Sequence, residues 1–163
     1  MKTVIKPIAN EYENEAANLI INIQQNEFGV PITLEDQPDL FNIQNFYHAG
    51  GGGFWGAFIE DELVGTIALV KFDEHEAAIR KMFVKKEFRG KEFSIAQKLL
   101  ETLIQYSKEN GINDLYLGTV SILKAALRFY EKNGFEYIEK EALPEKFPLM
   151  KPDTVFCHLN LKK

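Results

Sequence analysis

The sequence contains a single cysteine, Cys157, and no long apolar stretch. One cysteine excludes an internal disulfide and any zinc or iron–sulfur site built from several cysteines, so we predict no metal site. No apolar run approaches the roughly 20 residues that a membrane-spanning helix needs. The N-terminus lacks the apolar core of a signal peptide, because Lys6 and Pro7 interrupt it. Together these absences predict a cytoplasmic protein with no membrane contact.

The sequence also has fewer basic than acidic residues. The chain has 19 Lys and Arg against 24 Asp and Glu, which leaves a formal net charge of −5. Such a chain repels phosphates overall, so we expect no nucleic-acid partner. Its 163 residues, 45% of them hydrophobic, suffice for one well-packed core but not for two. We therefore predict a single domain over residues 1–163, as a monomer or a homodimer.

The hydrophobic pattern predicts a chain that mixes strands and helices. Strands are expected over residues 3–8, 54–59, 63–72, 77–84, 114–119, 135–138 and 154–161. Helices are expected over residues 10–26, 39–49, 94–110 and 122–133. The strands between residues 54 and 84 follow one another with short turns, which favours an antiparallel meander over βαβ units. Capping boxes are predicted where Asn10 precedes Glu13, and Ser94 precedes Gln97, by three residues.

Two segments are candidates for binding phosphates. Gly51, Gly53 and Gly56 fit the dinucleotide fingerprint G-x-G-x-x-G, but that site needs a strand before the glycines and a helix after them. Here a strand follows, so a flexible connection is the favoured interpretation. The basic turn at residues 85–91 lies between a strand and the helix that opens at Ser94, where first-turn amides and the helix dipole favour an anion. From the spacing alone, a phosphate site and a solvated basic loop are equally favoured.

The same region resembles a known family. Met82-Phe83-Val84-Lys85-Lys86-Glu87-Phe88-Arg89-Gly90-Lys91, followed by Ala96-Gln97-Lys98-Leu99-Leu100, resembles the acetyl-CoA motif of the GNAT N-acetyltransferase superfamily. The stretch from Phe129 to Phe135 resembles that superfamily's second motif. The resemblance implies an α+β fold, with a central, mixed but mostly antiparallel sheet of about seven strands and about four flanking helices. It also implies a V-shaped opening between the strands that end at Val84 and Thr119.

The resemblance further implies where acetyl-CoA binds and which groups act on it. The pyrophosphate would lie on the turn, the pantetheine arm along the backbone of residues 82–84, and the thioester near Tyr130. The cofactor-binding residues it implies are Met82, Val84, Arg89, Gly90, Lys91, Ser94, Ile95 and Ala96. A backbone N–H of Phe83 or Val84 is the expected donor to the oxyanion. Tyr130 is the expected proton donor to the departing thiolate. Transfer from an ordinary phenol to such a thiolate would be uphill by only about 2 kcal/mol.

Two departures from the family pattern stand out. Two additional residues lengthen the turn, so that Ser94 and Ala96 align with the family's usual glycines, and Glu92 would repel a pyrophosphate unless it points outward. Leu123 stands where many relatives have an asparagine that bonds the cofactor arm.

We therefore predict an acetyl-CoA-dependent N-acetyltransferase that moves an acetyl group directly onto a primary amine of a small molecule or peptide. The alternative is a non-catalytic module that senses acyl-CoA. Glu27 and Glu76 are candidate acids on the substrate side, although a chain of water molecules could deprotonate the amine instead.

Overall fold

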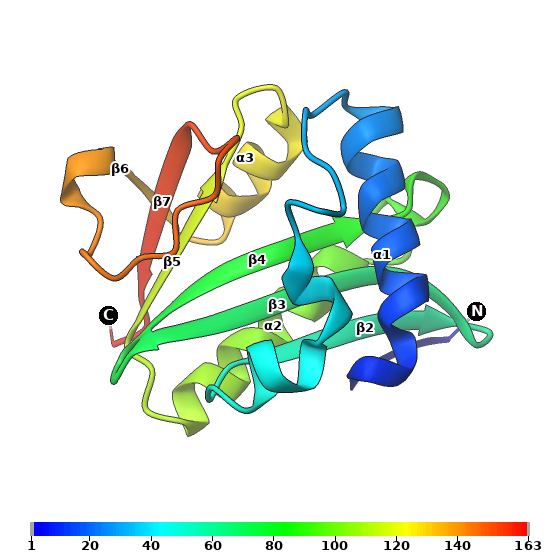
Figure 1. Cartoon of the computed structure of the whole chain (residues 1–163), viewed down its shortest axis with the longest axis horizontal. Helices are drawn as coiled ribbons and strands as arrows, with labels where there is room; N and C mark the ends of the chain where they lie inside the picture. Colours follow the sequence, from blue (N-terminus) through cyan, green and yellow to red (C-terminus); the bar gives the residue numbers. More distant parts are fainter. Residues whose placement is uncertain (1, 163) are drawn as a thin grey trace.

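The computed structural model describes residues 2–162, and a single seven-stranded sheet forms its centre (Figure 1). The strands are β1 (Thr3–Pro7), β2 (Gly53–Ile59), β3 (Glu62–Asp73), β4 (Glu76–Val84), β5 (Asp114–Thr119), β6 (Glu136–Ile138) and β7 (Val155–Asn160). Their order in the sheet is β1-β2-β3-β4-β5-β7-β6. All neighbours are antiparallel except β4 and β5, which are parallel. The predicted mixed, mostly antiparallel sheet is confirmed.

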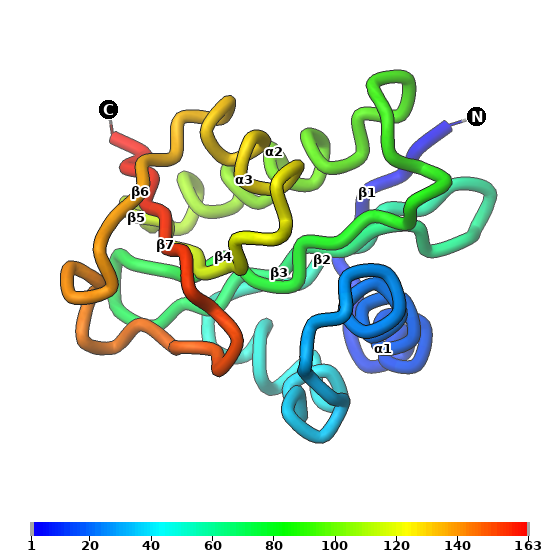
Figure 2. The backbone as a smooth tube through the Cα atoms, turned by 90° about the horizontal axis from the view of Figure 1, so that it is seen from above, coloured from blue at the N-terminus to red at the C-terminus, as the bar shows by residue number. Residues whose placement is uncertain are grey.

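Helices cover both faces of this sheet (Figure 2). One face carries α1 (Glu13–Ile21) and the short helical segments between α1 and β2. The opposite face carries α2 (Ile95–Glu109) and α3 (Lys124–Lys132). Each face has its own core, because the amphipathic helices turn their apolar sides to the sheet. None of the helices within residues 2–162 is long and apolar enough to span a bilayer.

Helix α1 continues as one wider helical turn over Asn22–Glu27. A single helix is predicted over residues 39–49, but the structure has two short helical segments there, Pro38–Phe41 and Gln44–His48. Short helical pieces also occur at Asn10–Tyr12, Lys86–Phe88 and Lys140–Ala142.

Both predicted capping boxes are wrong. Helix α1 begins three residues later than predicted, after a 3-10 turn, and Asn10 instead accepts a hydrogen bond from the backbone N–H of Gln44 (3.0 Å). Ser94 does occupy the N-cap of α2, but with a left-handed φ of 50° and no side-chain cap bond. Its hydroxyl donates to the carbonyl of Lys91 (2.8 Å).

The glycine-rich segment before β2 has a packing role. Gly53 opens a strand, not a helix, so the context of a dinucleotide site is missing, as the sequence predicts. A side chain at Gly52 would collide with the carbonyl of Leu69 on β3. The glycine therefore lets two backbones approach each other closely.

Candidate active site

Strands β4 and β5 separate in the middle of the sheet. Their pairing runs from Glu76–Asp114 to Ile79–Leu117 and ends there within the described part of the chain. The edge of β4 that faces β5 is therefore free of strand partners beyond Ile79. This divergence is the V-shaped opening that the resemblance implies.

A bulge in β4 lies beside this opening. On the β3 side, Thr66 pairs with Phe83 and Ala68 pairs with Arg80, so two residues of β4, Lys81 and Met82, face a single residue of β3. Lys81 has a φ of 57°, a left-handed conformation that costs energy in a residue with a side chain. The Thr66 hydroxyl donates a hydrogen bond of 2.7 Å to the carbonyl of Lys81 and holds the bulge.

A cavity of about 120 Å³ lies in the opening between the two strands. It is lined by β4 and β5, by the chain after α1, by α3, and by the loop before β7. Its lining includes Gln24, Phe28, Ile32, Ile79, Arg80, Lys81, Met82, Phe83, Gly118, Thr119, Leu123, Tyr130, Phe147, Met150 and Asp153. The cavity thus combines a mainly apolar wall with a few charged groups, as small-molecule sites usually do.

Tyr130 reaches the cavity from α3. Its side chain is buried, and its hydroxyl lies 3.8 Å from the sulfur of Met82 on β4. Burial, with the nearby Asp153 and Cys157, raises the pKa of Tyr130 well above its ordinary value of 10.0. The phenol is therefore protonated throughout the neutral range. Proton transfer from this phenol to an ordinary thiolate therefore costs more than the figure of about 2 kcal/mol for an ordinary phenol.

The turn before α2 is exposed and braced at one side. Arg89 donates through Nε to the carbonyl of Val84 (2.8 Å), and its two terminal nitrogens bond the carboxylate of Glu27. Lys91 is exposed, and the side chain of Glu92 folds back over Gly90. Arg89 thus ties the turn to the end of β4 and to the wide helical turn after α1.

The two acids predicted for the substrate side lie elsewhere. Glu27 bonds Arg89 and is outside the cavity. Glu76 pairs with Asp114 at the closed end of the β4–β5 pair, so the strand direction carries it away from the opening. Neither acid is brought to Tyr130.

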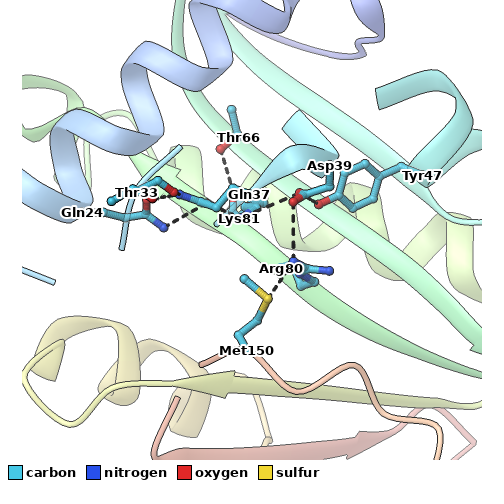
Figure 3. Close-up of polar contacts among 9 residues, drawn as sticks. All are labelled: Gln24, Thr33, Gln37, Asp39, Tyr47, Thr66, Arg80, Lys81 and Met150. Atoms are coloured by element: carbon cyan, nitrogen blue, oxygen red, sulfur yellow. Dashed lines mark hydrogen bonds and ion pairs between the residues drawn. The ribbon is translucent and has the colours of Figure 1, made fainter. Parts of the chain in front are cut away.

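The structure instead assembles a buried polar cluster on the α1 side of β4 (Figure 3). Lys81 donates to Gln37, whose amide exchanges hydrogen bonds of 2.9 and 3.3 Å with Gln24. Asp39 accepts from the hydroxyl of Tyr47 and lies 3.8 Å from the Lys81 ammonium. Burial lowers the pKa of Lys81 to about 8, although Asp39 partly opposes this shift.

Asp153, in the loop before β7, is a further member of the cavity wall. Its carboxylate packs against Gly118 of β5, where an added Cβ would meet one oxygen at 2.5 Å. No hydrogen bond or ion pair to that carboxylate is made within residues 2–162. Desolvation raises the pKa of Asp153 to about 6, while Arg80 and Lys81 act in the opposite direction.

Sequence reasoning did not single out Asp153, Arg80 or Lys81. Arg80 and Lys81 stand inside an ordinary strand pattern, and Asp153 belongs to a proline-containing loop without a recognisable motif. The signal that could have found them is two adjacent charged residues between apolar stretches of a central strand, because charged residues there are buried only with partners.

Comparison with solved structures supports this architecture. A GNAT-family acetyltransferase from Staphylococcus aureus Mu50 has a TM-score of 0.95 and 39% identity, over 98% of this chain and 99% of that chain. The PaiA N-acetyltransferase from Thermoplasma acidophilum, solved in complex with coenzyme A, has a TM-score of 0.78 over 98% of this chain and 99% of that chain. At 18% identity it shares the fold alone.

Sequence relatives agree with the structures. The uncharacterized N-acetyltransferase YjgM of Escherichia coli (strain K12) is 30% identical over 134 residues, 78% of either chain. The probable N-acetyltransferase camello of Xenopus tropicalis is 29% identical over 109 residues, 65% of this chain and 49% of camello. The chain thus spans about half the length of camello. The model of the acetyltransferase (GNAT) family matches residues 17–135, and the chain therefore belongs to that family.

Proposed function

We propose that the protein transfers an acetyl group from acetyl-CoA directly to a primary amine of a small molecule or peptide. The observation that supports this most strongly is the convergence of three groups on one cavity. They are the Tyr130 hydroxyl, the edge of β4 at Met82 and Phe83 that has no β5 partner, and the carboxylate of Asp153. Direct transfer to an amine needs a proton donor, an oxyanion donor and a base, and these groups match those three roles.

Acetyl-CoA would approach from the α2 and α3 side. The first helical hydrogen bond of α2 runs from Lys98 N–H to Ser94, so the amides of residues 95–97 precede the helical ladder and are available to a pyrophosphate. Lys91 adds a positive charge at this position. Glu92 must rotate away from Gly90, and its place in an exposed turn allows this. The thioester would then reach Tyr130 along the free edge of β4.

The chemistry requires one bond to form and one to break. The neutral amine attacks the thioester carbonyl, and a backbone N–H of Phe83 or Val84 stabilises the oxyanion. As the C–S bond breaks, Tyr130 gives its proton to the thiolate. Asp153 accepts the proton that the amine loses on forming the C–N bond, and this proton then returns to the Tyr130 phenolate, so that both groups recover their starting states. A base with a pKa of about 6 is ionised at neutral pH and suits this task.

The alternative, a non-catalytic acyl-CoA sensor, is favoured by Leu123, which replaces a polar contact with an apolar one in the cavity wall. Thiol release from acetyl-CoA with a panel of primary amines separates the two functions. Turnover supports the enzyme, whereas binding of acetyl-CoA without thiol release on any amine supports the sensor.

Tyr130→Phe tests the mechanism. We expect its rate of thiol release to fall about 10²- to 10⁴-fold, with calorimetric affinity for acetyl-CoA unchanged. Tyr137→Phe is the matched control, because Tyr137 is exposed on β6. A Tyr130→Phe variant that keeps the full rate across neutral pH would remove Tyr130 from the mechanism.

A further inference from the structure

We infer that the acceptor amine also carries a carboxylate, and that Arg80 is the residue that binds this carboxylate. The inference rests on the proposed acetyl transfer and narrows its substrate to amino acids and similar small zwitterions. It comes from the state of the Arg80 guanidinium, which is almost buried in the cavity wall with partners too weak for its charge.

The guanidinium of Arg80 has five N–H donors and almost no oxygen to receive them. Its side chain is 11% exposed. One terminal nitrogen lies 2.8 Å from the sulfur of Met150, and the Asp39 carboxylate is 3.9 Å away, beyond hydrogen-bond distance (Figure 3). The Arg80 Nε is fully buried and has no hydrogen-bond partner in the described part of the chain. The ring of Phe46, 5.7 Å away, adds a cation–π contact.

Such an arrangement is costly for the folded protein alone. A buried charged donor without an acceptor loses its hydration and regains little, and a thioether sulfur is a weak acceptor. Asp39 does not make up this loss, because the same carboxylate accepts from Tyr47 and also faces Lys81. One carboxylate thus serves two cations. A second carboxylate at Arg80 would supply acceptors to the terminal nitrogens, since Nε is fully buried, and the planar guanidinium can bond it through two parallel hydrogen bonds.

The ammonium group of such a ligand would also find a partner in the cavity. Asp153 lines the same cavity as Arg80 and carries no ion pair within residues 2–162. Asp153 and Tyr130 line the same cavity, so an ammonium held by Asp153 lies at the reacting end, where it releases one proton to water before the neutral amine attacks. A molecule with one ammonium and one carboxylate would thereby complete two charge pairs. A simple amine would complete only the pair with Asp153.

The cavity should therefore discriminate between amines that differ only in the carboxylate. A site that bonds a charged group rejects the analogue without it, because its own buried donors are then left unpaired. Loss of a hydrogen-bonded charge of this kind corresponds to roughly a 10- to 100-fold change. We expect at least this ratio in kcat/KM between an amino acid and its decarboxylated amine.

The test is acetylation of two matched pools by the full chain with acetyl-CoA. One pool contains the twenty common amino acids, and the other contains the corresponding amines without the α-carboxylate; acetylated products are identified by mass spectrometry. Arg80→Gln is compared with Arg128→Gln, because Arg128 is exposed on α3 and loses the same charge. We expect Arg80→Gln to lose about 10- to 100-fold on the preferred amino acid and little on its amine. Arg128→Gln should keep both activities.

Equal rates on the two pools, or an equal loss on both in Arg80→Gln, would overturn the inference, since the second result indicates a merely structural role. If neither pool is acetylated, the proposed transfer to such amines fails. Calorimetry with the same amino acids on the coenzyme A-loaded protein then decides the inference separately. Binding that Arg80→Gln abolishes would support the carboxylate site, and absence of binding would refute it.

Discussion

Replacing Asp153 with asparagine should make the protein more stable and less active at neutral pH. The wild-type carboxyl has a pKa of about 6, against an ordinary value of 3.8, because burial disfavours its charge. This difference corresponds to about 3 kcal/mol of folding free energy that the ionised group costs at pH 7. The pKa of about 6 already includes the opposing effect of Arg80 and Lys81, and residual water contact reduces what the substitution recovers. We therefore expect a gain of about 1–3 kcal/mol, or roughly 2–10 °C in Tm.

The gain in unfolding free energy of Asp153→Asn should depend on pH in a defined direction. Because the pKa is raised in the folded state, the contribution of Asp153 to wild-type stability is most favourable when the group is protonated, and this contribution falls as the pH rises through about 4 to 6. Asparagine is neutral at every pH. The difference in unfolding free energy between variant and wild type should therefore be largest above pH 6 and vanish below pH 4.

Urea unfolding at pH 4 and pH 7 measures this difference, and Asp73→Asn is the control, because Asp73 is exposed at the end of β3. The control should change stability by less than about 0.5 kcal/mol. In Asp153→Asn, removal of the proposed base should lower the rate of amine acetylation about 10²- to 10⁴-fold. An equal gain at both pH values would mean that packing, not charge, is responsible. An unchanged acetylation rate would exclude Asp153 as the base.

Two further predictions concern the cavity wall. Asp39→Asn leaves Arg80 and Lys81 without their shared anion, so the free energy of unfolding should fall by about 3–5 kcal/mol at pH 7; a loss below 1 kcal/mol in urea titration would contradict the buried network. Gly118→Ala places a methyl 2.5 Å from a carboxylate oxygen of Asp153 and should displace it. Acetylation should then fall about 10- to 100-fold with little loss of Tm, and full activity would show that this carboxylate need not be held there.

Most of the architecture could be predicted from local pattern. Alternating and β-branched residues predicted all seven strands, and the close spacing of β2, β3 and β4 predicted their antiparallel order, because short turns permit little else. Helix ends were predicted less well. At Asn10 and Ser94, residue type indicated a cap that each side chain does not make, because other backbone groups compete for the same atoms.

Residues of the candidate site can likewise be predicted where they belong to a contiguous motif, and not where the fold brings them together. Sequence motifs alone predict roles for Tyr130, the turn at Arg89–Ala96 and the strand at Met82–Val84, since each motif lies within a few consecutive residues. Glu27 and Glu76 were proposed from their neighbourhood in sequence, and the fold places them outside the cavity. The charged side chains of the cavity wall, Arg80, Lys81 and Asp153, and their buried neighbour Asp39 come from three separate parts of the chain.

The sheet, the family resemblance and the side of the molecule where acetyl-CoA is expected can all be predicted from the amino-acid sequence, because they follow from hydrophobic period and contiguous motifs. The charged side chains that line the cavity beside Tyr130 become apparent only in the folded chain. The bulge at Lys81 and the end of β4–β5 pairing bring a loop near residue 153 against a strand near residue 80. Burial then changes the acidity of groups that are ordinary in the unfolded chain. Solvent exclusion and charge pairing depend on distances in space, and no local pattern of residues encodes those distances.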